Sequence, residues 1–264
     1  MPLLVCATPI GNLDDVTLRV LDALRGADVV LCEDTRHTRT LLDRHAIDAR
    51  TLSYHEHNEA ARTAELLPRL EAGETIALVS DAGMPGISDP GARIVRSARD
   101  AGVEVTVLPG PSAVETALVA SGLVGERYQF LGFLPRGAKP WPELVNVPWP
   151  SVAFESPQRL PATLRSLAEF DRDRAVAVCR ELTKRFEEVV RGTAAELAAR
   201  FADAPKGEIT LVVGGAASVP AVDEAEALAA VADLVEAGVP RRRAAELIAR
   251  VSGVARNRLY RGSL

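Results

Sequence analysis

The feature that most constrains the fold is a regular alternation of short apolar runs and helical stripes in the first half of the chain. Leucines three residues apart, at Leu18, Leu21 and Leu24, mark the first stripe. The apolar runs have the length of buried strands: Leu3–Ala7, Asp28–Cys32, Thr51–Tyr54, Thr75–Val79 and Val103–Leu108. Continuous apolar strands that alternate with helices predict a mainly parallel α/β sheet.

Polar or glycine- and proline-rich segments follow four of these strands: Thr8–Asn12, Glu33–Arg36, Ser80–Gly86 and Pro109–Ser112. Because the carboxyl ends of parallel strands meet at one edge of a sheet, we expect a ligand site at that edge. Asp89 and Pro90 are typical of the N-cap and first position of a helix, and they predict that the next helix begins there.

The second half predicts another α/β domain and a helical tail. Five strands are expected, at Tyr128–Phe133, Val152–Phe154, Ala175–Cys179, Glu188–Arg191 and Ile209–Val213. Helices are expected at Pro157–Phe170, Ala194–Ala202, Asp223–Ala237, Arg241–Val251 and Ala255–Arg261. The proline-rich stretch between Pro135 and Pro150 is expected to be an exposed loop. We predict domains at residues 1–115, 116–218 and 219–264.

Charge is distributed unevenly along the chain. The net charge of −5 argues against a nucleic-acid binder. Residues 240–264, however, hold seven arginines and one acid, Glu246, so this segment carries +6 and the remainder −11. The last two expected helices have the shape of a helix-turn-helix that contacts phosphates, although plain packing of a solvated helical face explains them equally well. Candidate RNA-binding residues are Arg241, Arg242, Arg243, Arg256 and Arg258.

Several site classes find no support in the sequence. It contains no GxGxxG after the first strand, no Walker A motif and no GxSxG. His55-Glu56-His57 is better explained as a polar loop than as a metal site, and no metal is expected. Three dispersed cysteines indicate reduced core thiols, and no apolar stretch approaches a membrane span or a signal peptide, so we expect a cytoplasmic protein.

An ordered set of motifs between Leu3 and Gly215 resembles the tetrapyrrole-methylase superfamily of S-adenosylmethionine-dependent methyltransferases. The motifs are TPIGNLDDVTLR (Thr8–Arg19), EDTRHT (Glu33–Thr38), SYHEHNE (Ser53–Glu59), LVSDAGMPGISDPG (Leu78–Gly91), LPGPSA (Leu108–Ala113), GFLPR (Gly132–Arg136), FESPQRL (Phe154–Leu160), RELTKRFEEVVRGT (Arg180–Thr193) and KGEITLVV (Lys206–Val213). The resemblance implies two α/β domains with the cofactor cleft between them, a small C-terminal helical module and a homodimer.

S-adenosylmethionine is the cofactor that the resemblance implies. Glycines such as Gly83 and Gly86 would let the backbone approach it, and the helix start at Gly110–Ser112 would offer free N–H groups. The cofactor residues implied by the motifs are Pro9, Ala82, Gly83, Met84, Ile87, Ser112, Ala113, Phe154, Glu155, Leu182, Glu208 and Ile209.

Within the superfamily, the motifs are most similar to the branch that methylates a cytidine ribose 2′-hydroxyl in 16S rRNA of the small ribosomal subunit. The alternatives are a corrin or porphyrin C-methyltransferase and an RNA-binding assembly factor without catalysis. Candidates for orienting the ribose or phosphate and accepting the proton are Glu33, Asp34, Arg36 and Lys206, although these charges could instead form structural salt bridges. The stretch after Leu134 has only Arg136 and Lys139, fewer than many relatives, so more RNA contact is expected from the tail.

Overall fold

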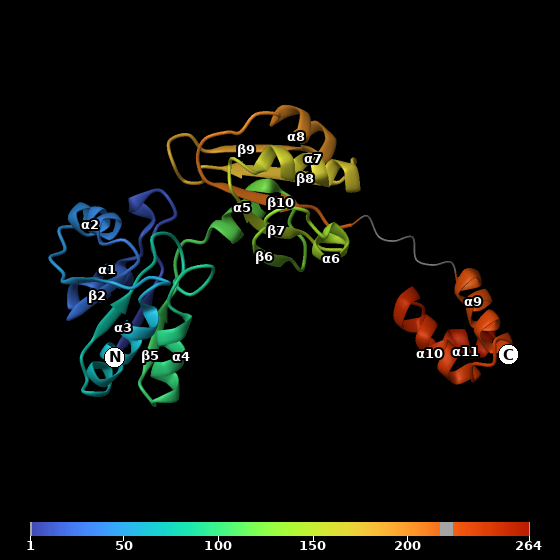
Figure 1. The fold of residues 1–264 in the computed structure, drawn as a ribbon, viewed down its shortest axis with the longest axis horizontal. Coiled ribbons are helices and arrows are strands. Elements are labelled where there is room, and N and C mark those ends of the chain that lie inside the picture. The colour runs from blue at the N-terminus through green and yellow to red at the C-terminus, as the bar shows by residue number, and fades with distance from the viewer. Residues whose placement is uncertain (1, 217–223, 264) are drawn as a thin grey trace. The chain divides into compact units, whose positions relative to one another are not determined.

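The computed structural model describes residues 2–216 and 224–263 (Figure 1). The chain divides into two compact units. An α/β unit comprises Met1–Val145 and Trp149–Gly214, and a helical unit comprises Asn146–Pro148 and Gly215–Leu264.

The first sheet of the α/β unit contains five strands in the order β3-β2-β4-β1-β5. The strands are β1 (Leu3–Cys6), β2 (Val29–Cys32), β3 (Thr51–Ser53), β4 (Ile76–Leu78) and β5 (Val105–Leu108). Every pair in this sheet is parallel, with Leu3 opposite both Ile76 and Val105. The predicted parallel α/β sheet is therefore confirmed.

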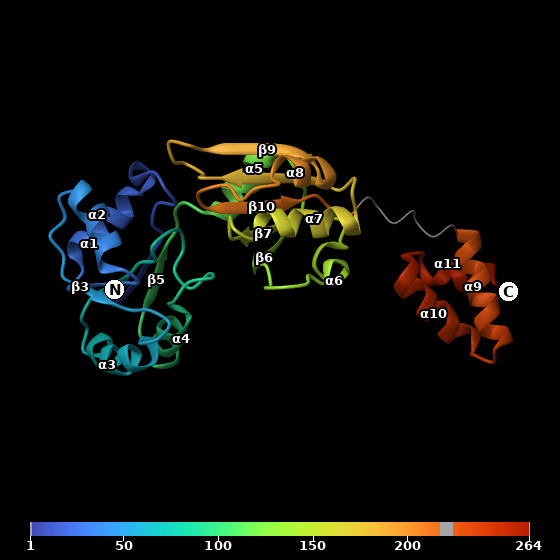
Figure 2. The same cartoon turned by 45° about the horizontal axis from the view of Figure 1, so that its top comes forward.

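Helices cover both faces of this sheet (Figure 2). Alternate residues of β1 point to opposite faces, so Leu4 packs with α1 (Leu18–Gly26) and α2 (Thr35–Arg44), while Leu3 packs with α3 (Glu59–Glu71) and α4 (Ala92–Asp100). A short 3₁₀ helix, η1 (Leu13–Asp15), precedes α1.

Strand order places a crevice between β1 and β4. These two strands are neighbours, yet the connection after β1 leads to α1 on one face and the connection after β4 leads to α4 on the other. Connections that diverge in this way open a gap at the carboxyl ends of the strands. The loops 7–12 and 79–91 therefore lie at the position where an α/β sheet binds ligands.

The prediction that Asp89 caps the next helix is wrong. Helix α4 begins at Ala92, and its N-cap is Gly91, whose φ of 137° is open to glycine but not to most other residues. Asp89 is left in the preceding loop, where its carboxyl can serve another purpose.

The second sheet has the strand order β6-β7-β10-β8-β9. Its strands are β6 (Gln129–Phe133), β7 (Ser151–Glu155), β8 (Ala175–Arg180), β9 (Glu188–Thr193) and β10 (Ile209–Val213). Only the β6–β7 pair is parallel, and the other pairs are antiparallel. Helices α7 (Leu160–Phe170) and α8 (Ala194–Arg200) pack on one face, and α5 (Ala113–Ser121) packs on the other.

The proline-rich stretch is only partly the exposed loop that the sequence predicted: residues 135–138 are exposed, but a buried helical turn follows. It contains a short helix, α6 (Trp141–Val145), and Trp141 is only 3% exposed. The Trp141 indole donates to Ser166 Oγ on α7 at 3.0 Å, which satisfies its only polar atom inside the core. A helix of five residues is too short to show a periodic apolar pattern, so the prolines led to the prediction of a loop.

The helical unit contains α9 (Glu224–Glu236), α10 (Arg241–Ser252) and α11 (Arg256–Gly262) around a small core of Ala227, Val231, Ala244, Ala245 and Leu259. Gly253 ends α10 at a φ of 72°, which makes the turn between the last two helices. Two expectations lie outside the described residues: the domain boundary at 218/219 and the helix start at 223. The expected domain boundary at 115/116 lies within α5. Among the described helices, none is long and apolar enough to span a bilayer.

Candidate active site

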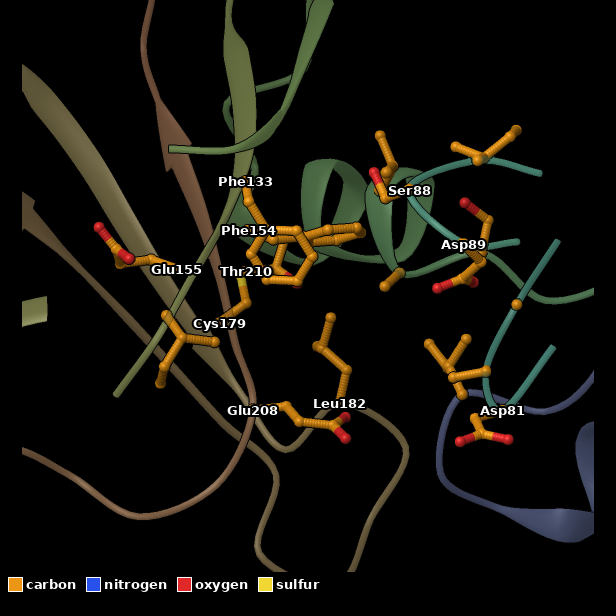
Figure 3. Close-up of a pocket in the computed structure, with 18 of the residues that line it drawn as sticks. Asp81, Ser88, Asp89, Phe133, Phe154, Glu155, Cys179, Leu182, Glu208 and Thr210 are labelled. Carbon is orange, nitrogen blue, oxygen red and sulfur yellow. The ribbon is translucent and has the colours of Figure 1, made fainter. Parts of the chain in front are cut away.

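A cavity of about 530 Å³ lies in the α/β unit, where the loops after β1 and β4 face the second sheet (Figure 3). This volume is in the range of small-molecule sites. Ile10 and the loop 81–89 form one wall, and the start of α5 contributes Ser112 to Val114. The second sheet and its loops contribute Phe133, Phe154, Glu155, Ser156, Pro157, Cys179, Leu182, Gly207, Glu208, Ile209 and Thr210.

Gly83 anchors the loop of the first wall. Its N–H donates to Thr8 O at 3.1 Å, and its carbonyl accepts from Thr8 N at 2.8 Å, so β1 and the loop are tied together. Both backbone groups of Gly83 are thus occupied by protein. A Cβ here would make ordinary contacts with Ile10 at 3.7 Å and with Pro111 O at 3.9 Å, so it is the φ of +74° that favours glycine at this position.

Asp89 enters the cavity from the end of the same loop (Figure 3). The residue before it, Ser88, has a φ of 62°, an uncommon conformation for any residue other than glycine. Burial, followed by the negative charge of Glu33, raises the pKa of the half-buried Asp89 carboxyl to about 6, despite a hydrogen bond from Ser80. Asp81 adds a further negative charge on this wall.

The opposite wall is largely apolar. The Phe154 ring makes edge contacts with Phe130 and Phe133, with centroids 5.0 and 5.3 Å apart. A register shift in β6 between Phe130 and Phe133 leaves the Phe133 ring 62% exposed at the cavity. Burial raises the pKa of the Cys179 thiol to about 12, so this sulfur is protonated and unreactive. Such a wall suits a planar aromatic ring.

Glu155 is committed to the protein rather than to the cavity. Its side chain is fully buried, and it accepts from Thr163 Oγ1 at 2.6 Å and from the Ser156 N–H at 2.8 Å. It also pairs with Arg159, and with Lys139 at 3.9 Å. Lys139 is only 6% exposed, and burial lowers the pKa of its ammonium, so this lysine is not a surface contact for RNA.

The N-terminus of α5 opens toward the cavity. Ser112 stands at the N-cap, but its hydroxyl donates to Glu115 and caps no backbone N–H. The first-turn N–H groups at Ala113 and Val114 therefore remain available at the cavity wall. Gly110 has a different purpose, because a Cβ there would lie 2.9 Å from Ala7 Cβ; this glycine lets the ends of β1 and β5 meet.

Eleven of the residues predicted to bind cofactor line this one cavity: Ala82, Gly83, Met84, Ile87, Ser112, Ala113, Phe154, Glu155, Leu182, Glu208 and Ile209. Pro9 is buried and is not among the lining residues. The sequence reasoning missed the other eleven lining residues: Ile10, Asp81, Ser88, Asp89, Val114, Phe133, Ser156, Pro157, Cys179, Gly207 and Thr210. Asp89 lies inside a quoted motif, and its ordinary cap-like context concealed it.

None of the four predicted catalytic candidates lines the cavity. Asp34 caps α2 and pairs with Arg36 at 2.8 Å, and the Arg36 hydrogen bonds hold the pKa of Asp34 down to about 2. The Arg36 side chain is 90% exposed. Lys206 is also exposed, whereas Glu33 is half-buried and electrostatically coupled to Asp89.

The cavity has a negative character. Of the described residues that line it, four are acidic and none is Lys or Arg; Glu155 and Glu208 are paired with Arg159 and Lys184 outside the lining, whereas Asp81 and Asp89 have no such cation. A ligand with positive charge fits such a site, and S-adenosylmethionine carries a sulfonium and an ammonium group beside a flat adenine. The donor set and the apolar wall therefore fit this cofactor.

The histidine loop offers no metal centre. His55 Nε2 lies 3.0 Å from the Asn58 amide, and its Nδ1 is buried without a partner. The rings of His55 and His57 are 6.0 Å apart. Throughout residues 2–216 and 224–263, no three His, Cys, Asp or Glu side chains are grouped to hold a metal ion.

The arginines of the helical unit are on its surface. Arg243 pairs with Glu246 at 3.1 Å, and Arg258 pairs with Glu224 at 3.3 Å. Arg242 and Arg256 are exposed, and Arg241 is half-buried. The charges are segregated, because α9 carries acidic residues while α10 and α11 carry the arginines.

Comparison with known proteins places this geometry in a family. A profile described as Tetrapyrrole (Corrin/Porphyrin) Methylases matches residues 2–198. Ribosomal RNA small subunit methyltransferase I from Mesorhizobium japonicum is 44% identical over 98% of this chain and 90% of its own length. The protein of that name from Thermotoga maritima is 45% identical over 81% of this chain and 98% of its own length.

Among solved structures, uroporphyrin-III C-methyltransferase from Thermus thermophilus in complex with S-adenosylhomocysteine has a similar fold. The TM-score is 0.59 at 18% identity, and the match covers 81% of this chain and 97% of that chain. The expected fold and the resemblance stated from the motifs are both confirmed. The chain belongs to the tetrapyrrole methylase family and is an S-adenosylmethionine-dependent methyltransferase.

Proposed function

We propose that this enzyme methylates the 2′-hydroxyl of a cytidine ribose in 16S rRNA of the small ribosomal subunit. The observation that carries the proposal is the similarity to ribosomal RNA small subunit methyltransferase I over 98% of the chain, helical unit included. The Thermotoga maritima protein of that name and the uroporphyrin-III enzyme both cover 81% of the chain, so the two are distinguished by sequence identity, which is 45% for the first and 18% for the second.

The cavity's charge also favours RNA over a tetrapyrrole. Tetrapyrrole acids carry several carboxylates, and the described lining of the cavity has four acids and no Lys or Arg to receive them. A ribose hydroxyl is neutral, and the phosphates beside it can remain outside the cavity. Exposed Arg36 and Lys206 are proposed to contact those phosphates.

We assign the cofactor to the cavity as follows. The apolar side chains of Phe154, Leu182 and Ile209 would pack on the adenine, and the first-turn N–H groups at Ala113 would receive the carboxylate. Carboxylates at Asp81 and Glu208 would attract the cationic groups. When bound, the cofactor supplies an electrophilic methyl group, whose carbon–sulfur bond breaks with the electron pair staying on sulfur.

The helical unit is proposed to strengthen binding to RNA. Its last two helices present the five candidate arginines, and two of these pair only with exposed acids that phosphates can displace. The enzyme is further proposed to act in the cytoplasm as a homodimer, with two α/β domains and this helical module in each chain.

The proposal is tested by incubating the full chain with tritiated S-adenosylmethionine and one of two acceptors. The first is 30S subunits that lack the ribose mark, and the second is a tetrapyrrole acid. Transfer to the 30S subunits alone is expected. Transfer to the tetrapyrrole alone would overturn the proposal, and cofactor-independent RNA binding without transfer would favour an assembly factor.

A further inference from the structure

We infer that Asp89 is the group that takes the proton from the substrate hydroxyl, an inference that rests on the proposed ribose methylation. The first support is position. Asp89 lines the cavity and lies on the wall that faces Phe154 and Thr210 of the second sheet (Figure 3). A group that serves as general base must reach the hydroxyl from inside the site.

The second support is the way in which the loop holds Asp89. Ser88 adopts a φ of 62°, and the loop is closed on itself by bonds from Gly86 N to Pro90 O at 3.2 Å and from Ile87 N to Met84 O at 3.3 Å. A left-handed serine costs about 1 kcal/mol or more, and it persists only where its surroundings fix it. Ser88 thus lies between two residues that line the cavity, Ile87 and Asp89.

The other acids of the cavity are already engaged. Glu155 is fully buried against Arg159 and Thr163. Glu208 pairs with Lys184 at 3.0 Å, and Asp81 accepts from the Asp34 N–H at 3.2 Å. The Ser80 hydroxyl near Asp89 donates to the carbonyls of Ala82 and Gly83 at 3.2 and 3.3 Å, and the Asp89 carboxyl forms no ion pair with a described residue, which leaves acceptor capacity for a substrate.

The charges around Asp89 make it a stronger base than an ordinary aspartate. Glu33 after β2 and Asp81 after β4 face it with negative charge, and His55, Asp34 and Glu56 in turn act on Glu33. Burial and these acids raise the pKa of Asp89 to about 6. A base with a pKa near the working pH combines the ionised form with good proton affinity.

The step balances as follows. The 2′-oxygen forms its bond to the methyl carbon with its own electron pair, and its proton moves to Asp89 Oδ. Sulfur keeps the electron pair of the bond that breaks, so the cofactor loses its positive charge. Because Asp89 is half-exposed, the proton then passes to water, and the carboxylate is restored for the next turnover.

The test compares Asp89→Asn, Asp89→Glu and the matched control Asp100→Asn, an exposed position at the end of α4. Single-turnover transfer to 30S subunits is measured from pH 5 to 8.5, and cofactor affinity is measured by calorimetry. We expect Asp89→Asn to lose about 10²- to 10⁴-fold in rate with cofactor affinity nearly unchanged, and Asp89→Glu to recover part of the rate. The wild-type rate should rise with pH, with a midpoint near pH 6 set by the pKa of Asp89. Carbon-13 NMR should show that the Asp89 carboxyl titrates at the same pH.

Two outcomes separate the inference from the proposed function. Methyl transfer by the wild type together with an Asp89→Asn rate within about threefold of it would overturn the role of Asp89 alone. No transfer to RNA by the wild type would overturn the proposed function and the inference with it. A tenfold loss of cofactor affinity in Asp89→Asn would assign Asp89 to cofactor binding instead.

Discussion

Replacing Glu155 with alanine should destabilise the α/β unit strongly. The carboxylate of Glu155 is inaccessible to solvent and joins the end of β7 to the start of α7 through Thr163 and Arg159. Without it, the guanidinium of Arg159 and the 6%-exposed ammonium of Lys139 lose their counter-charge, and Thr163 Oγ1 loses its acceptor. Removing one partner of a buried ion pair costs about 3–5 kcal/mol.

The loss is measured by urea unfolding followed by tryptophan fluorescence, because Trp141 and Trp149 both lie in the α/β unit. At about 2–4 °C per kcal/mol, the thermal midpoint should fall by about 6–20 °C. Glu169→Ala, at an exposed position of α7, is the control and should change the free energy of unfolding by less than about 0.5 kcal/mol. A loss below about 1 kcal/mol in Glu155→Ala at an unchanged denaturant slope would refute the reasoning.

Three further predictions concern the loop, the tail and pH. Gly83→Val places a β-branched residue at a φ of +74° and should abolish cofactor binding in calorimetry through distortion of the loop; wild-type affinity would contradict this. Truncation before Pro240 should weaken RNA binding and flatten its salt dependence in filter-binding assays, while cofactor affinity stays within about twofold; unchanged RNA affinity would sink the role of the arginines. Because folding raises the pKa of Asp89 from its usual value near 3.8 to about 6, the stability linked to this carboxyl is complete below pH 4 and is lost as pH rises to 6. The group is half-exposed, so solvent screening reduces the effect. Between pH 4 and 7, the free energy of unfolding of Asp89→Asn should rise by about 1–2 kcal/mol relative to that of the wild type, as measured by urea unfolding. A difference between the two proteins that does not change with pH would contradict the raised pKa.

The parallel sheet could be predicted because its evidence is local. Strands such as Val29–Cys32 are uniformly apolar, and each one ends in a polar break. The motif resemblance then identified half of the residues that line the cavity, between Ala82 and Ile209. In the second sheet, the apolar strands did not reveal their antiparallel pairing, because a strand buried on both faces has the same pattern in either orientation.

What the sequence could not provide depends on tertiary contacts. The buried network of Glu155 could not be predicted, since nothing near this residue in sequence shows that Thr163 and Lys139 converge on its carboxylate. Trp141 looked exposed among prolines because its partner Ser166 is 25 residues away. Asp89 looked like a helix cap because the left-handed turn at Ser88 is visible only in three dimensions. In each case the deciding feature is a contact with a residue distant in sequence or a local backbone conformation.

The central claim is that this methyltransferase modifies a cytidine ribose in 16S rRNA. It is tested most directly by treating unmodified 30S subunits with the full chain and S-adenosylmethionine carrying a deuterated methyl group, followed by nucleoside mass spectrometry of the 16S rRNA. Deuterated 2′-O-methylcytidine is expected at a single position of the 16S rRNA. A deuterated methyl group found only on a base would contradict ribose methylation. So would the absence of label from the rRNA when the enzyme is saturated with cofactor.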